Sequence, residues 1–233
     1  MQNIGVFFGS RAAEHDVSII SGLQILENAD KAKYNVFPVY VSRKGEWFVG
    51  EPLKNVETYK HFDENMKGLT KVYLPPVPGM GGLYANASGL FAKAKLVCPM
   101  DCAILAFHGM NGEDGTMQGV LELAGIPYVG CGVAASANTM DKSLTKKVVE
   151  GTGVRQARYY LALACDFACN PEGVVRTAAE QLGSFPVFVK PCSQGSSVGV
   201  AKANNMLELA EGLTEAFKMD SKVLVEEFID GHE

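Results

Sequence analysis

The sequence predicts an α/β protein in two parts, a doubly wound parallel-sheet domain over residues 1–129 and an α+β unit over residues 130–233. Three observations support this fold class. The chain opens with an apolar segment, a helical pattern and a second apolar segment, which is the order of a parallel strand–helix–strand unit. After residue 130, predicted helices and strands are interleaved without an internal repeat. A length of 233 residues suits two domains of about a hundred residues each.

The elements of the N-terminal part follow from the spacing of its apolar residues. A short apolar run that ends at Gly9-Ser10 is typical of a buried strand before a tight turn, and apolar residues at helical spacing come next. Residues 51–95 have weak periodicity and a Pro/Gly cluster, so they predict irregular or edge structure without an assigned function. The predicted elements are a strand over residues 4–8, a helix over 16–28, a strand over 36–41, a hairpin through Lys44-Gly45 into 46–49, a strand over 103–107 and a helix over 117–124 that ends at Gly125.

The C-terminal part begins with a helix that has signals at both ends. Asp141 can cap its N-terminus, the helix runs to Glu150, and Gly151 ends it. The remaining predicted elements are strands over residues 158–163, 187–190, 199–201 and 223–227, and helices over residues 173–182 and 206–217.

Composition excludes several classes of function. Hydrophobic residues make up 47% of the chain and charged residues 20%, as in an ordinary packed protein. A net charge of −5 without a basic stripe argues against nucleic-acid binding. The first residues lack the pattern of a signal peptide, and no apolar run is long enough to span a membrane. These observations predict a cytoplasmic protein without nucleic-acid or membrane partners.

The six cysteines predict reduced, mostly buried thiols rather than disulfides. Cys98/Cys102 and Cys165/Cys169 form two Cys-x-x-x-Cys pairs, which raise the question of zinc. Their spacing is loose and Cys102 opens an apolar run, so no residue is predicted to be a metal ligand.

The most informative segment is Lys190-Pro-Cys-Ser-Gln-Gly-Ser-Ser-Val-Gly199. A short apolar strand leads a lysine directly into a loop in which Gly195 and Gly199 can take unusual backbone angles and Ser196 and Ser197 add hydroxyl donors. Such a loop can wrap its N–H groups around phosphate oxygens while the ammonium neutralises their charge. It matches neither the Walker nor the Rossmann pattern, and an ordinary glycine-serine turn is the alternative.

Two further loops follow predicted buried strands, where ligands of parallel sheets bind. In the first, Glu14 could accept hydrogen bonds from a substrate ammonium, or Glu14 and Asp16 could merely favour a helix N-terminus. The second holds four glycines within residues 108–119. His108 is placed there to donate to an anion or carboxylate, the alternative being a surface histidine held by the turn, with Asp114 as a helix cap.

Two more segments carry charges that could serve a nucleotide. Met140-Asp-Lys142 opens a helix, with Lys146 and Lys147 following, although most helical lysines are simply solvated. The apolar strand over residues 223–227 ends in acids, and Glu233 lies beyond it. Such a strand could bind adenine through backbone groups and a ribose through a carboxylate, or its acids could only face solvent.

Together these segments resemble the D-alanine–D-alanine ligases of the ATP-grasp superfamily. The similarity runs from Ile4 to Glu233 and rests on five motifs in the same order, none of them specific alone. They are Glu14-His-Asp-Val-Ser18, His108-Gly-x-x-Gly-Glu-Asp-Gly-Thr-x-Gln-Gly119, Met140-Asp-Lys142, Lys190-Pro-x-x-x-Gly-Ser-Ser-Val-Gly199 and Glu226-x-x-x-x-Gly-x-Glu233. The resemblance implies a substrate-binding pre-ATP-grasp domain over residues 1–129 and a nucleotide-binding central ATP-grasp subdomain over residues 130–233.

The resemblance also implies an activity and roles for residues. In this family, which supplies peptidoglycan synthesis, ATP phosphorylates the carboxylate of one D-alanine, and the amine of a second attacks the acyl phosphate. Glu14 and Ser196 would be catalytic, with Glu14 on the ammonium of the first D-alanine and His108 near the second. The residues implied for ATP are Lys142 and Lys190 at the phosphates, Ser196, Ser197 and Val198 in the closing loop, Glu226, Glu227 and Ile229 at adenine, and Glu233 at ribose.

One departure from the family pattern stands out, because a C-terminal ATP-grasp subdomain with the Mg²⁺ ligands does not follow Glu233. The resemblance therefore implies that Mg²⁺ ligands lie outside this sequence and that the chain alone has no measurable ligase turnover. D-Serine or D-lactate as acceptor stays open, as do a non-catalytic ATP-binding module and another carboxylate–amine ligase. The resemblance further implies a homodimer formed through the N-terminal domain.

Overall fold

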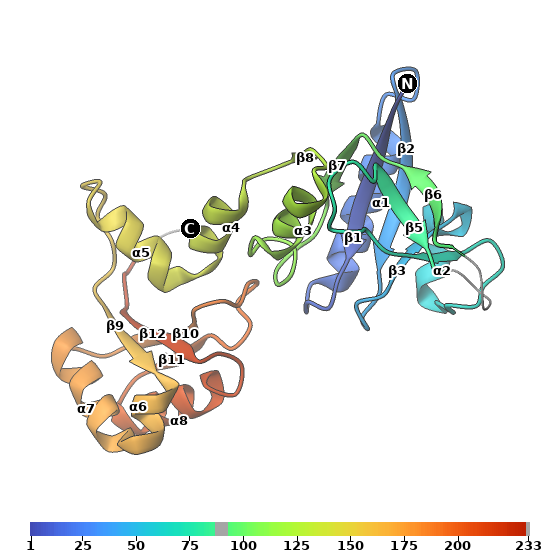
Figure 1. The fold of residues 1–233 in the computed structure, drawn as a ribbon. Coiled ribbons are helices and arrows are strands. Elements are labelled where there is room, and N and C mark those ends of the chain that lie inside the picture. Colours follow the sequence, from blue (N-terminus) through green and yellow to red (C-terminus); the bar gives the residue numbers. More distant parts are fainter. Residues whose placement is uncertain (87–92, 232–233) are drawn as a thin grey trace. The chain divides into compact units, whose positions relative to one another are not determined.

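The computed structural model describes residues 1–86 and 93–231, which form two compact units, Met1–Ser136 and Ala137–Glu233 (Figure 1). The division lies seven residues beyond the predicted boundary at 129/130. Because each unit has its own core, each is described separately. The predicted fold class is confirmed: a largely parallel sheet with helices on both faces is followed by an α+β unit.

The first unit is built on a six-stranded sheet with the strand order β4-β3-β2-β1-β7-β8. β1 pairs in parallel with β2 and with β7, and β7 with β8, whereas β3 and β4 continue the sheet as antiparallel strands after the predicted hairpin. The main elements are β1 (Gln2–Gly9), α1 (His15–Asn28), β2 (Tyr34–Val41), β3 (Trp47–Val49), β4 (Thr70–Val72), β7 (Cys102–Leu105), α3 (Thr116–Ala124) and β8 (Tyr128–Val129).

Helices cover both faces of this sheet because successive side chains of a strand point to opposite sides. Phe7 packs in the core with Leu121 of α3, while Val6 and Phe8 pack in the other core with Ile19 of α1. The connection through α1 moves from β1 to β2, and the one through α3 moves from β7 to β8, in the opposite direction along the sheet. The strand order therefore reverses between β1 and β7, the position where doubly wound sheets bind ligands.

Residues 51–95 were predicted to be irregular or at an edge, and the described part of this segment contains short elements. β4 is the edge strand of the main sheet, and β5 and β6 pair with each other in a separate two-stranded ribbon. Weak periodicity hid these elements because each is only three to five residues long. They are the 3₁₀ helix η1 (Glu51–Lys54), α2 (Glu57–Lys60), β4, β5 (Gly82–Ala85) and β6 (Lys95–Pro99).

The second unit is a four-stranded antiparallel sheet in the order β11-β10-β12-β9. Residues of α7 and α8 pack with Val187, Val189, Val223 and Val225, so these helices cover one face of the sheet. The alternate residues on β10 and β12, including Lys190 and Glu226, belong to the other face. The elements are α4 (Val133–Met140), which begins in the first unit, α5 (Lys142–Glu150), β9 (Tyr159–Leu163), α6 (Ala164–Cys169), α7 (Pro171–Leu182), β10 (Val187–Pro191), β11 (Ala201–Ala203), α8 (Met206–Ala216) and β12 (Lys222–Glu227).

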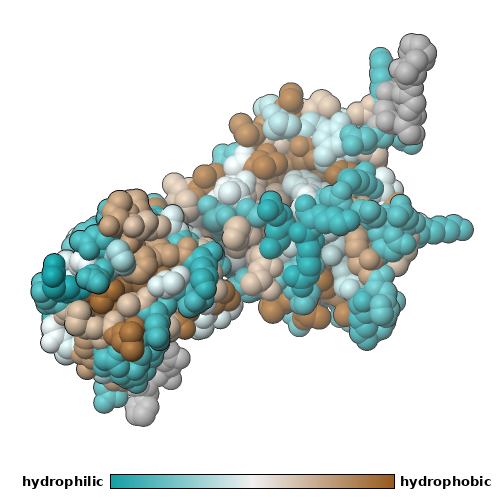
Figure 2. Space-filling model, turned by 90° about the horizontal axis from the view of Figure 1, so that it is seen from below, coloured by the Kyte–Doolittle hydropathy of each residue, from teal (hydrophilic) through white to brown (hydrophobic). Residues whose placement is uncertain are grey.

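Hydrophilic and hydrophobic side chains are intermixed over the described surface on the face shown in Figure 2. Among residues 1–86 and 93–231, every helix is too short or too polar to cross a bilayer.

Candidate functional site

The predicted amino-acid site lies where the strand order reverses. Glu14 immediately precedes α1, in the loop after β1, and His108 lies in the loop after β7. Ser21 Oγ on α1 is 2.9 Å from His108 Nε2. A Cβ atom added to Gly109 would lie 2.5 Å from Glu14 Oε2, so the Glu14 carboxylate rests against the residue that follows His108. The structure thus brings the two predicted residues together.

A buried serine that the sequence analysis did not single out fixes both loops. Ser18 Oγ accepts a hydrogen bond from Gly9 N at 2.8 Å and donates one to Ala106 O at 2.8 Å, and the side chain is fully buried. One hydroxyl therefore joins the end of β1 to the end of β7. The sequence signal for Ser18 was its position in the motif, one helical turn after Glu14.

The loop after His108 is held by its own polar residues. Glu113 Oε2 accepts from Gly109 N at 2.8 Å, and Asp114 accepts from Asn111 N at 2.8 Å and from Thr116 N at 3.0 Å. Asp114 therefore bonds the first residue of α3 from the position before the N-cap, which is Gly115, so it is not the helix cap that its alternative role predicted. These bonds restrain the backbone beside Glu14, which favours a preorganised binding loop over a flexible one.

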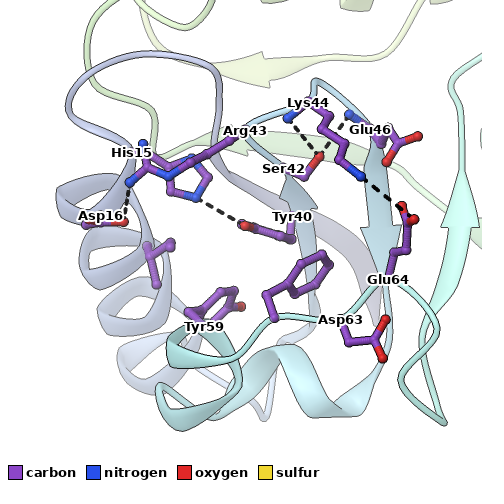
Figure 3. Close-up of a pocket in the computed structure, with 12 residues that line it drawn as sticks. His15, Asp16, Tyr40, Ser42, Arg43, Lys44, Glu46, Tyr59, Asp63 and Glu64 are labelled. Carbon is purple, nitrogen blue, oxygen red and sulfur yellow. Dashed lines mark hydrogen bonds and ion pairs between the residues drawn. The ribbon is translucent and has the colours of Figure 1, made fainter.

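A cavity of about 490 Å³ in the same unit lies elsewhere (Figure 3). His15 Nε2 is 3.1 Å from the Tyr40 hydroxyl at its wall, and its rim carries the Arg43–Asp16 pair. Burial lowers the pKa of His15 and raises the pKa of Tyr40 to about 12, so both are neutral at pH 7. Neither Glu14 nor His108 lines this cavity, which separates it from the predicted site.

In the second unit, two predicted lysines lie near the start of the glycine-serine loop. Lys142 is the first residue of α5, and its Nζ donates to Gln194 O at 2.5 Å. Its backbone N–H donates to Cys192 O at 3.0 Å. Lys190 lies on β10 immediately before the loop, on the face opposite α7 and α8. Lys142 thus brings its ammonium group to the loop, whereas the Lys190 ammonium group lies beside Glu226 and over the Phe188 ring.

The loop backbone differs from the prediction at its glycines. Gly199 has a positive φ of 71°, as expected, but Gly195 does not; Ser196 (47°) and Ser197 (59°) take the left-handed conformation instead. Left-handed backbone costs a residue with a side chain about 1–2 kcal/mol, and such strain clusters at binding sites. The loop continues through Val200, so the strand predicted at 199–201 begins only at Ala201. Ser196 and Ser197 are exposed, while Val198 N–H donates to Gly195 O at 2.9 Å.

Glu226 joins this site through two lysines. Its carboxylate is 2.8 Å from Lys146 Nζ and also pairs with Lys190 Nζ, and the residue is buried. Burial alone would raise the pKa of Glu226, but the two ammonium groups outweigh it and hold the pKa below its usual value. The sequence analysis assigned no role to Lys146. Its position one helical turn after Lys142 was the signal, because residues four apart share a face of a helix.

The remaining predicted nucleotide residues lie at or beyond the end of β12. The Glu227 side chain pairs with Arg158 Nε at 2.6 Å, and the Glu227 N–H donates to Arg158 O at 3.0 Å. Because this N–H is already bonded, the backbone group that Glu227 could offer to adenine is its carbonyl. Ile229 is 63% exposed in the segment after β12. Glu233 lies outside the described residues.

The prediction of mostly buried cysteines is wrong. Cys192 is buried, Cys98 and Cys102 are half-buried, and Cys131, Cys165 and Cys169 are exposed. Cys165 and Cys169 lie on α6, a six-residue helix in which no residue is buried. In the part of the chain that is described, no three His, Cys, Asp or Glu residues are grouped as metal ligands would be.

Cysteine exposure predicts a selective alkylation pattern. Burial is the largest cause that raises the pKa of Cys192 to about 11, so this thiol carries almost no thiolate at pH 8. Iodoacetamide under native conditions is expected to label Cys131, Cys165 and Cys169 at least about tenfold faster than Cys192. Peptide mass spectrometry measures the rates, and rapid native labelling of Cys192 would contradict the buried placement.

Comparisons with known proteins give matches to both parts of the chain. The family model described as "D-ala D-ala ligase N-terminus" matches residues 3–131, and the one described as "D-ala D-ala ligase C-terminus" matches residues 148–233. The D-alanine–D-alanine ligase of Thermosipho melanesiensis is 38% identical over the whole chain, and that of Acetivibrio thermocellus is 40% identical over 98% of it. The chain spans 61% and 62% of the lengths of these two relatives.

Solved structures give the same result. The VanG D-Ala:D-Ser ligase from Enterococcus faecalis superposes with a TM-score of 0.83 at 32% identity, over 99% of this chain and 63% of its own. The D-alanine–D-alanine ligase from Coxiella burnetii gives a TM-score of 0.82 at 28% identity, over 99% of this chain and 65% of its own. Because the N-terminal family model alone matches more than half of the residues, the chain belongs to the D-alanine–D-alanine ligase family.

Proposed function

We propose that this chain forms the amino-acid-binding and nucleotide-binding parts of an ATP-dependent D-alanine–D-alanine ligase. The observation that carries the proposal is the Lys142 ammonium group bonded to a loop with two left-handed serines, with Lys190 on the strand that leads into this loop. Two ammonium groups and exposed hydroxyls suit the crowded negative charge of a triphosphate. Glu14 beside the His108 loop supplies the carboxylate that a zwitterionic amino acid requires.

In the proposed reaction, a carboxylate oxygen of the first D-alanine takes the γ-phosphoryl group of ATP, giving an acyl phosphate and ADP. The amine nitrogen of the second D-alanine then attacks the acyl carbon, phosphate leaves, and the amine loses a proton. Glu14 would hold the first ammonium and His108 would lie near the second substrate. Lys142 and Lys190 would contact the ATP phosphates, the loop of Ser196 would close over the γ-phosphate, and the Glu226–Ile229 segment would contact adenine.

The proposal extends to the surroundings of the enzyme. We assign it to the cytoplasm, where ATP is available, and to a homodimer formed through the first unit. Magnesium would accompany ATP, but the described residues contain no cluster fitted to hold it, so no step is assigned to it.

The proposal predicts that Lys142→Ala weakens ATP binding by about 10- to 100-fold, because a charge-assisted hydrogen bond contributes roughly 1.5–3 kcal/mol. Isothermal titration of the chain with ATP measures the affinity. Lys147→Ala is the matched control, since Lys147 lies on the same helix but is exposed and pairs with Glu150. Equal ATP affinities of the two variants would contradict the phosphate assignment.

A parallel titration with D-alanine separates the proposal from its main alternative. The ligase proposal requires D-alanine binding that Glu14→Gln weakens, because the neutral amide no longer attracts the substrate ammonium. Binding of ATP without D-alanine would favour a nucleotide-binding module that has lost its amino-acid site.

A D-serine acceptor is a second candidate, because the VanG neighbour is named a D-Ala:D-Ser ligase and superposes over 99% of this chain. Competition between D-serine and D-alanine at the second amino-acid position, in the presence of ATP, decides between the two acceptors.

A further inference from the structure

Lys222, the first residue of β12, and Asp220, two residues before it, make contacts that the proposed function has not used. Asp220 Oδ2 accepts a hydrogen bond from Ser193 N at 2.6 Å, and Asp220 Oδ1 accepts one from Lys222 N at 3.1 Å. Lys222 O accepts from Cys192 N at 3.0 Å. Cys192 and Ser193 are the first two residues after β10, so β12 holds the glycine-serine loop at its base.

The same strand also holds the start of α5. The Lys222 ammonium pairs with the carboxylate of Asp141, whose side chain is only 12% exposed. Asp141 in turn caps α5, accepting from Ser143 N at 2.9 Å and from Leu144 N at 3.2 Å. Because Asp141 directly precedes Lys142, the ion pair fixes the residue next to the predicted phosphate ligand.

The two sets of contacts close into one network. Lys142 N donates to Cys192 O at 3.0 Å, and Lys142 Nζ donates to Gln194 O, so the helix start and the loop base are bonded to each other as well as to β12. An exposed ion pair that stood alone would contribute little. Here a half-buried ion pair and a helix cap act together with backbone hydrogen bonds donated by Lys142, Cys192 and Ser193.

We propose that Asp220 and Lys222 are positioning residues that hold Lys142 and the glycine-serine loop ready for the phosphates of ATP. The inference rests on the proposed function and goes beyond it, because neither side chain is offered to the nucleotide. The Lys222 ammonium is already paired with Asp141, and both oxygens of Asp220 accept backbone N–H groups. Their contribution is preorganisation, which spares ATP the cost of ordering the loop.

Two variants test the proposal by different routes. Asp220→Asn keeps the shape but places an amide N–H₂ against one of two backbone N–H donors, and Lys222→Met removes the charge but keeps the side-chain length. Each is expected to weaken ATP binding about tenfold and to speed amide exchange of residues 193–200 by about tenfold or more. Lys222→Arg, which retains a positive donor, is expected to restore both properties to within about threefold of wild type.

The matched control is Lys218→Met, because Lys218 is an exposed lysine four residues earlier that pairs with Glu215. It is expected to leave ATP affinity and loop exchange unchanged. Unchanged loop exchange in both Asp220→Asn and Lys222→Met would overturn this inference alone. Faster loop exchange with undiminished ATP affinity would overturn it too, by showing a purely structural role. Absence of ATP binding by the wild-type chain would instead overturn the proposed function, and with it the purpose assigned to the network.

Discussion

Glu226→Gln is expected to lower the local stability of β10 and β12 by about 2–4 kcal/mol at pH 7. The Glu226 carboxylate lies between Lys146 Nζ and Lys190 Nζ, and the Lys146 and Lys190 side chains are only 12% and 30% exposed. Without the negative charge, two ammonium groups remain close together with a neutral amide between them. Breaking one side of a buried ion pair is costly for this reason. Amide hydrogen exchange of β10 and β12 under native conditions measures the change in opening free energy.

The local stability lost in Glu226→Gln should become smaller as the pH falls. The folded-state pKa of Glu226 is lower than that of an unfolded glutamate, about 4.3. Its ionic stabilisation is therefore fully present above about pH 5 and disappears as the pH falls through the folded-state value. The difference between wild type and Glu226→Gln should be constant from pH 5 to 8 and shrink below about pH 4. An equal difference at pH 3 and pH 7 would show that packing, rather than charge, causes the loss.

Glu215→Gln is the control for this prediction. Glu215 also pairs with a lysine, Lys218, but both side chains are more than 60% exposed. Water screens such a pair, so its removal should change the stability by less than about 0.5 kcal/mol at any pH.

Most of the fold could be predicted because its main elements are marked locally. The helix capped by Asp141 is confirmed, with both cap bonds made by that side chain, and the helix over 117–124 does end at Gly125 in the left-handed conformation. Strands β1, β2 and β10 carry continuous apolar runs or regular alternation. Elements of three to six residues, such as β4 and α6, carry too few apolar positions to establish a period, and tertiary packing decides their conformation.

The site was predictable only in part, for a similar physical reason. The motifs contain Glu14, His108, Lys142 and Lys190. Each of these residues lies near the end of a strand or the start of a helix, where α/β proteins commonly bind ligands. Hydrogen bonds between segments distant in sequence leave no such pattern. The Ser18 bridge to Ala106 spans 88 positions, and the Asp141–Lys222 pair spans 81. The left-handed backbone at Ser196 and Ser197 could not be predicted from the sequence either, because serine rarely adopts this conformation.

Gly109→Ala is expected to weaken D-alanine binding by about tenfold to a hundredfold while costing only about 1–2 kcal/mol of stability. Gly109 has a φ of +72°, which alanine adopts at that cost, and the new Cβ would lie 2.5 Å from Glu14 Oε2. The end of a glutamate side chain can move away, so the protein should still fold. The movement, however, displaces the carboxylate proposed to hold the substrate ammonium, and an error of about 1 Å in such a contact costs about a hundredfold. Isothermal titration with D-alanine measures the affinity.

Gly119→Ala separates this effect from the general consequences of adding a methyl group in the same motif. Gly119 lies within α3, has no positive φ, and has nothing within 4 Å of its added Cβ. Alanine there should stabilise the helix by about 0.5–1 kcal/mol and leave D-alanine affinity unchanged. The two glycines differ both in backbone conformation and in what their new methyl groups would meet, and only the methyl group of Gly109→Ala would contact Glu14. If Gly109→Ala bound D-alanine as tightly as Gly119→Ala does, then Glu14 could not be the residue that holds the substrate ammonium.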